Sequence, residues 1–76
     1  MANVYMILYS QIMPLGTKLK RLRRRRELTQ EALARRLRIT REHIAKIELG
    51  VIRSPRMEMR RRLARALRVP ITELLD

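Results

Sequence analysis

The side chains of this sequence that could do chemistry are mainly guanidinium groups. Nineteen residues are Lys or Arg and seven are Asp or Glu, which gives a formal net charge of +12 at pH 7. A guanidinium group pairs with phosphate and with guanine in a planar fork. An anionic membrane or an acidic protein would also attract this charge, but nucleic acid is the partner that the composition favours.

The remaining polar side chains argue against an enzyme or a metalloprotein. The chain has one His, His43, and no Cys, so a zinc site is not expected. The seven carboxylates are scattered along the chain and form no nucleophile–base pair with a neighbour. We therefore expect no catalytic residue, no metal and no cofactor.

Residues 41–49 place charged side chains on one face of a predicted helix. With about 100° between successive residues, Glu42 and Lys46 face outward, and Arg41 stands at the N-terminal end. Glu42 and Lys46 are also at i, i+4 spacing, so a surface ion pair is one alternative role for them. Phosphate contact rather than base contact is the alternative for Arg41 and Lys46.

This helix must be held in place by other elements. Thr29 and Thr40 are suitable N-cap residues, and Gly50 is typical of the position just after a helix. Capping signals and apolar spacing together predict helices at residues 18–26, 30–37, 41–49 and 56–67, and a short fifth helix after Pro70.

The two central predicted helices are joined by a tight turn at residues 38–39. They can cross closely because Ala34 is small at the point where they meet. Ile39, Ile44 and Ile47 would anchor the second helix from behind. This arrangement is typical of a helix-turn-helix, in which the N-terminal end of the second helix enters the major groove of DNA.

The N-terminal residues differ in composition, because residues 1–17 carry no charged side chain. We divide the chain into an uncharged segment, residues 1–16, and a helical DNA-binding domain, residues 17–76. Within the first segment, Val4–Tyr9 is rich in strand formers. It is either a short β-strand that pairs across a dimer, which we favour, or part of an extension upstream of a natural start at Met13.

The length and the apolar pattern limit where the protein works. A chain of 76 residues forms one small domain, so dimerisation is expected to add buried surface. No run of about 18 apolar residues is present to span a bilayer. The apolar N-terminal run lacks the basic start of a signal peptide. We therefore expect a cytoplasmic protein that does not enter a membrane.

Many residues between positions 18 and 75 match one known pattern together. They are Leu22-Arg23, Leu28-Thr29-Gln30-Glu31-Ala32-Leu33-Ala34, Leu37-Arg38-Ile39-Thr40, Ile44-Ala45-Lys46-Ile47-Glu48, Gly50, Pro55 and Leu63-Ala64-Arg65-Ala66-Leu67-Arg68-Val69. With these residues the chain resembles the phage repressor/Cro-like, or XRE-type, helix-turn-helix family. That resemblance implies an all-α, compact bundle of about five helices with a central helix-turn-helix.

The resemblance also implies which residues contact the DNA bases and which contact the DNA backbone. The base-reading positions of the family fall on Arg41, Glu42 and Lys46. The Gln that opens the second helix, here Gln30, lies at a phosphate and beside the first reading residue. The positions expected to contact the DNA backbone are Gln30, Thr40, His43, Arg53, Ser54 and Arg56.

Other positions bear on the fold. The family pairs the positions of Arg23 and Glu48 across the bundle, so a partly buried ion pair is expected. Glu27 and Arg38 stand where the family often has Gly, so those turns are expected to differ slightly. Arg60 stands where the family has Leu. Either its stem packs while its head reaches water, or its helix is rotated.

The predicted fifth helix is unusually apolar for a short terminal element. We expect Ile71, Leu74 and Leu75 to form a dimer interface. The resulting homodimer would bind double-stranded operator DNA with a palindromic sequence. The expected function is a sequence-specific transcriptional regulator, as a dimeric repressor. An antitoxin and a restriction-modification controller are alternatives within that class. The alternative from another class is a basic helical adaptor that binds RNA or an acidic protein.

Overall fold

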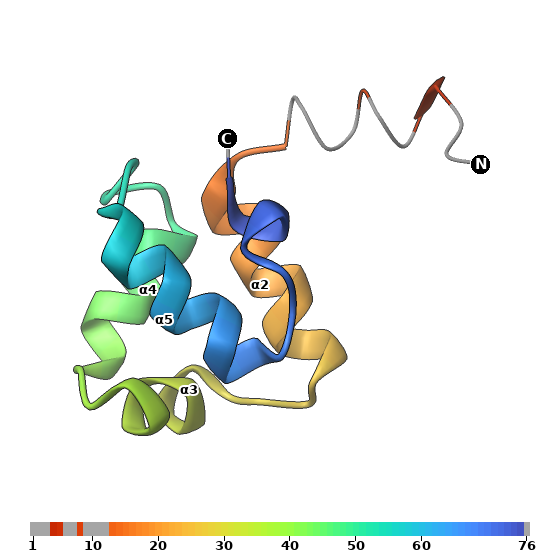
Figure 1. The fold of residues 1–76 in the computed structure, drawn as a ribbon. Helices are drawn as coiled ribbons and strands as arrows, with labels where there is room; N and C mark the ends of the chain where they lie inside the picture. Colours follow the sequence, from red (N-terminus) through yellow and green to blue (C-terminus); the bar gives the residue numbers. More distant parts are fainter. Residues whose placement is uncertain (1–3, 6–7, 9–12, 76) are drawn as a thin grey trace.

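The computed structural model describes residues 4–5, 8 and 13–75 (Figure 1). The described residues form helices and contain no strand, which confirms the all-α prediction of a small bundle. The last of the five predicted helices is a single 3-10 turn. The elements are α2 (Leu15–Arg25), α3 (Gln30–Leu37), α4 (Arg41–Glu48), α5 (Met57–Leu67) and the 3-10 helix η1 (Ile71–Leu74).

The described part of the N-terminal segment does not form the predicted strand. Val4, Tyr5 and Leu8 are helical and exposed; the rest of Val4–Tyr9 lies outside the described residues. A helix satisfies its backbone hydrogen bonds within its own segment, whereas a strand needs a neighbouring strand. Because Val4, Tyr5 and Leu8 have helical backbone, the strand prediction is wrong for these three residues.

Threonine side chains start the two central helices where the sequence places them. The Thr29 Oγ1 accepts a hydrogen bond from the backbone N–H of Ala32 at 3.0 Å. The Thr40 Oγ1 accepts one from the N–H of His43 at 3.2 Å. Each cap satisfies an N–H that has no partner inside its helix. The chain leaves α4 through Gly50, whose φ is +83°.

Helix α2 begins at Leu15, earlier than the predicted start at Lys18. Its N-cap is Pro14, so Thr17 lies inside the helix. The reason is packing against the end of α4. A Cβ on Gly16 would lie 2.5 Å from the carbonyl oxygen of Glu48, so only Gly allows this approach.

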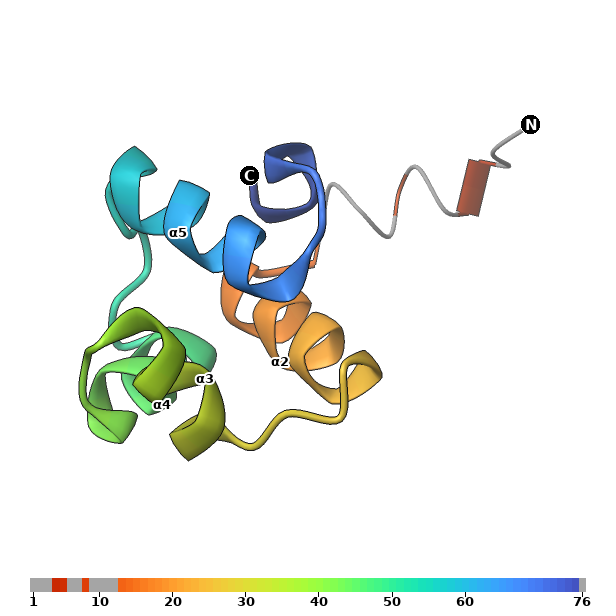
Figure 2. The same cartoon turned by 60° about the horizontal axis from the view of Figure 1, so that its bottom comes forward.

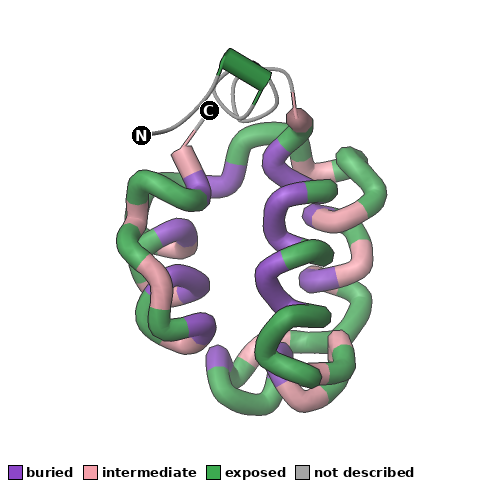
Figure 3. The backbone as a smooth tube through the Cα atoms, turned by 90° about the vertical axis from the view of Figure 1, so that its right-hand side faces the viewer, coloured by how far each residue is buried: buried purple, intermediate pink, exposed green. Residues whose placement is uncertain are grey.

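One core joins all the elements. Helix α3 packs on α4, and α2 contacts both α4 and η1. Figure 2 shows α3 and α4 together on one side of the molecule and α5 with η1 on another. Figure 3 shows that the buried residues of each helix face the interior. The largest fully buried side chains are Leu19, Leu33, Ile44, Ile47, Leu63, Leu67 and Leu74.

Three helix ends use a left-handed residue that is not Gly. Glu27, Arg38 and Arg68 have φ of 55°, 56° and 56°. At the second of these, the N–H of Ile39 donates to the carbonyl of Ala34 at 3.0 Å, which is the hydrogen bond that closes such a helix end. The backbone therefore adopts the left-handed conformation that suits Gly at each turn. At each of these turns, holding a residue with a side chain in the left-handed conformation costs about 1–2 kcal/mol of stability.

Arg60 fits neither interpretation drawn from the sequence. Its side chain is buried, and its guanidinium group donates to the carbonyl of Pro55 at 2.9 Å, the carbonyl of Leu74 at 3.0 Å and the Oγ of Ser54 at 3.2 Å. The head does not reach water. Helix α5 is not rotated either, because Leu63 and Leu67 remain fully buried.

Part of the positive charge supports the fold rather than a ligand. Arg26 donates to the carbonyls of Leu67 and Arg68 at the end of α5, at 2.8 and 3.0 Å. Arg62 donates to the carbonyl of Leu37 at the end of α3. Cations at helix C-termini are favourable because the last carbonyl groups lack partners and carry the negative end of the helix dipole. Net charge alone therefore overstates the charge that is available to a nucleic acid.

Candidate nucleic-acid interface

Helix α4 presents a polar face outward and an apolar face inward. Ile44 and Ile47 are buried beneath it. Arg41, Glu42 and Lys46 are all exposed on its outer side, so the structure brings the three predicted reading residues to one surface. The terminal nitrogen of Arg41 is 4.0 Å from a carboxylate oxygen of Glu42, and both side chains are more than half exposed. An exposed pair of this kind contributes little stability.

The ion pair expected beneath this face is present. The Arg23 Nε lies 2.7 Å from the Glu48 Oε2, and the Arg23 Nη2 donates to the Glu48 Oε1 at 3.0 Å. A third guanidinium nitrogen donates to the carbonyl of Leu28 at 2.7 Å. The pair thus joins α2, the α2–α3 turn and the last residue of α4. Arg–carboxylate pairs with two hydrogen bonds are among the strongest polar contacts.

Gln30 connects this buried pair to the exposed face. Its Nε2 donates to the Glu48 Oε1 at 3.1 Å, and its Oε1 accepts from the Arg41 Nη1 at 3.2 Å. Sequence reasoning placed Gln30 beside Arg41, and the structure does bring them together. It did not anticipate the hydrogen bond to Glu48, for which the sequence offers no local signal because the two residues lie on different helices.

The loop between α4 and α5 carries three further predicted DNA contacts, Arg53, Ser54 and Arg56. Arg53 and Arg56 are exposed, and Arg56 is the N-cap residue of α5. Ser54 is exposed, but its Oγ accepts the hydrogen bond from Arg60. The buried arginine thus fixes the loop on which the two exposed arginines stand.

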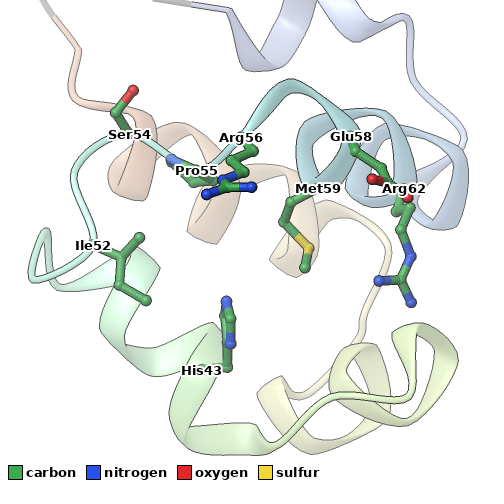
Figure 4. Close-up of a pocket in the computed structure, with 8 residues that line it drawn as sticks. All are labelled: His43, Ile52, Ser54, Pro55, Arg56, Glu58, Met59 and Arg62. Atoms are coloured by element: carbon green, nitrogen blue, oxygen red, sulfur yellow. The ribbon is translucent and has the colours of Figure 1, made fainter.

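His43 does not lie with the reading residues. It is half-buried and faces an open hollow of about 440 Å³ between α4 and α5. Figure 4 shows His43 entering the hollow from α4 and Met59 entering it from α5. In the same view Arg56 lies beside Pro55, on the opposite side of the hollow from His43. The hollow is lined by His43, Ile52, Ser54, Pro55, Arg56, Glu58, Met59 and Arg62.

The sequence matches one protein-family model, described as Helix-turn-helix, over residues 19–74. The match spans all of α3, α4 and α5 and most of α2. This chain belongs to the Cro/XRE-like helix-turn-helix family. Membership makes it a DNA-binding transcription regulator. The search of curated proteins found no match, and the search of solved structures found none.

One of the three residues expected at a dimer interface is buried within this helix-turn-helix protein itself. Leu74 is 0% exposed and belongs to the chain's own core, so it is not available to a partner. Ile71 and Leu75 are half-buried. Among the described residues, the large apolar side chains that are exposed include Leu49 at 79% and Val51 at 68%, on either side of Gly50.

The described residues offer neither a cluster of metal ligands nor a membrane span. Among residues 4–5, 8 and 13–75 of this helix-turn-helix protein, no group of three or more His, Cys, Asp or Glu side chains could hold a metal ion. No helix in the same part of the chain is long and apolar enough to cross a membrane.

Proposed function

We propose that this protein is a sequence-specific repressor that binds a palindromic operator as a homodimer. The observation that carries the proposal is the placement of Arg41, which stands at the first position of α4, exposed and hydrogen-bonded by Gln30. The N-terminal end of the second helix is the part of a helix-turn-helix that enters the major groove. A guanidinium group held there can form a fork with the O6 and N7 of guanine.

The other reading residues lie within reach of the same groove. Lys46 is exposed farther along α4 and can contact an acceptor on a base edge. Glu42 can accept from a cytosine amino group, although its carboxylate also lies near Arg41. We therefore assign sequence preference to Arg41, Lys46 and Glu42.

Contacts to the phosphate backbone would set the position of α4 without choosing a sequence. We assign this role first to the exposed Arg53 and Arg56, because they stand on a loop fixed by Arg60. Neutral donors of the side chain or backbone can add to these contacts. The residues proposed for them are Gln30, Thr40, His43 and Ser54.

A homodimer would place two α4 helices about 34 Å apart, which is one turn of DNA. Burial of Leu74 moves the proposed interface away from the C-terminal residues. Leu49 and Val51 are the better candidates, because both apolar side chains are largely exposed on either side of Gly50. Sedimentation at micromolar concentration tests this assignment. Leu49→Asp should weaken dimerisation on a palindromic duplex, whereas Ile71→Asp should do so only if the C-terminal residues form the interface.

The function itself is tested by selecting bound duplexes from a random pool at two salt concentrations. A repressor of this kind should enrich a palindrome whose half-sites are about 10 base pairs apart. Binding that depends on salt but shows no preference among duplexes would instead support a basic adaptor. A monomer on the selected duplex would exclude the dimeric form of the proposal.

A further inference from the structure

The amide group of Gln30 lies between a carboxylate and a guanidinium group. On one side its Nε2 is 3.1 Å from the Glu48 Oε1, and on the other its Oε1 is 3.2 Å from the Arg41 Nη1. The Glu48 side chain is almost fully buried and is also held by two hydrogen bonds from Arg23. The three links form a continuous path from the core to the outer end of α4.

The direction of that amide is fixed by its two neighbours. A carboxylate only accepts hydrogen bonds and a guanidinium group only donates them. The Gln30 NH₂ must therefore face Glu48, and the Gln30 carbonyl must face Arg41. The reverse orientation would set oxygen against oxygen and donor against donor, which breaks both hydrogen bonds. Because Glu48 is clamped by Arg23, it determines which end of the amide reaches the surface.

We infer that Glu48 is a specificity-determining positioning residue: through Gln30 it holds the Arg41 guanidinium in the direction needed to contact a base. The inference rests on the proposed function, in which Arg41 reads the operator. Glu48 itself touches no DNA in this scheme. Its effect is to present a carbonyl oxygen to Arg41 before DNA arrives, so that less side-chain freedom is lost when the fork with guanine forms.

A purely structural role for Glu48 predicts a different outcome. Loss of a residue that only stabilises the fold lowers the fraction of folded protein and weakens binding to every duplex alike. Loss of a positioning residue lowers the preference for the correct base over an incorrect one. The ratio of the two dissociation constants therefore separates the roles, whereas affinity alone does not.

The experiment removes the path at two points. Arg23→Met together with Glu48→Met deletes the ion pair without leaving one buried charge alone. Gln30→Met deletes the amide and leaves the ion pair intact. The dissociation constant of each variant is measured on the selected operator and on a duplex in which the base pair read by Arg41 is exchanged. That base pair is identified as the one at which Arg41→Ala loses its preference. The operator preference should fall about fivefold in both variants, while Arg53→Ala should leave it unchanged.

Combining the changes decides whether Glu48 acts through Gln30. In the Gln30→Met background, the Arg23→Met and Glu48→Met changes should cause no further loss of preference. A further loss of similar size would overturn the inference, because Glu48 would then act by another route. An unchanged preference in Gln30→Met overturns it as well, and does so even if the ion-pair variant fails to fold. If Arg41→Ala itself leaves the preference unchanged, the reading contact of the proposed function is wrong and the inference falls with it.

Discussion

The Nη1 of Arg60 donates a hydrogen bond to the carbonyl oxygen of Leu74 at 3.0 Å, in a buried contact between α5 and η1. The same guanidinium group reaches back to Pro55 and Ser54 at the start of α5. One side chain therefore joins the loop that carries the proposed phosphate contacts to the C-terminal 3-10 helix.

Replacing this arginine should destabilise the fold even when the new residue is apolar. Arg60→Leu introduces the residue typical of the family but leaves the buried carbonyls of Pro55 and Leu74 without their donor. Each unsatisfied buried group costs about 1–3 kcal/mol. We expect thermal unfolding at a clearly lower temperature. Arg61→Ala, an exposed neighbour, should change stability by no more than about 0.5 kcal/mol. Equal melting temperatures for Arg60→Leu and the native chain would contradict this account.

The Arg23–Glu48 pair gives a second prediction for stability. Glu48→Ala leaves the guanidinium group of Arg23 buried without its carboxylate, and breaking such a pair costs about 3–5 kcal/mol. The double replacement Arg23→Met with Glu48→Met should cost much less, because neither charge remains. Glu42→Ala is the matched control, since that carboxylate is mostly exposed. Chemical denaturation of the native chain and the three variants measures the free energies of unfolding. Equal stability of Glu48→Ala and Glu42→Ala would show that the Arg23–Glu48 pair does not stabilise the fold.

Gly16 should not tolerate a methyl group. A Cβ there would clash with the carbonyl oxygens of Ile47 and Glu48, so α2 would have to move away from α4. The strain should cost about 1–3 kcal/mol, more than the helix propensity that Ala gains. Gly50→Ala is the comparison, because a Cβ at Gly50 meets nothing within 4 Å and its cost is only the positive φ. If Gly16→Ala had the same melting temperature as the native chain, the close approach of α2 to α4 would be refuted.

Arg38→Gly should stabilise the protein. Arg38 has a φ of 56° at the end of α3, where an L side chain is strained by about 1–2 kcal/mol. Part of that gain is lost to the greater freedom of Gly in the unfolded chain. A net gain of about 1 kcal/mol would raise the melting temperature by about 4–8 °C. Arg38→Ala removes the same charge but keeps the Cβ, so it should show no such increase; a rise of equal size would assign the effect to charge instead.

The proposed distinction between base-reading contacts and phosphate contacts predicts two kinds of binding defect. Arg53→Ala should weaken binding to all duplexes alike and reduce the slope of affinity against salt by about one unit. Arg41→Ala should cost about 1–3 kcal/mol on the operator and little on scrambled DNA. Titration of both variants on both duplexes across a salt series measures this. Equal losses for Arg41→Ala on the two duplexes would make it a phosphate contact.

The central helices could be predicted from the sequence because their signals are local. Thr29 and Thr40 act within a few residues of themselves, and both cap the helices that the sequence places after them. The inward positions of Ile44 and Ile47 follow from helical spacing alone. The family resemblance, confirmed over residues 19–74, rests on the same local pattern.

The start of α2, the burial of Arg60 and the burial of Leu74 could not be predicted in this way. Leu74 has an apolar surface that could serve either a partner or its own core, and only the position of α5 and α2 determines which. Likewise, the sequence cannot show that the carbonyls of Pro55 and Leu74 converge on one side chain.

The sequence by itself determined the helix-turn-helix, its caps and the outward face of α4, because capping and helical periodicity act over a few neighbouring residues. The tertiary structure alone decided that Gln30, which the family resemblance already places beside Arg41, also bonds Glu48, so that the three residues form one hydrogen-bonded path. These contacts join residues on different helices, and their existence depends on how closely α3 and α4 cross. The physical reason is that a hydrogen bond requires atoms within about 3 Å, a condition that the packing of distant segments sets and local sequence does not.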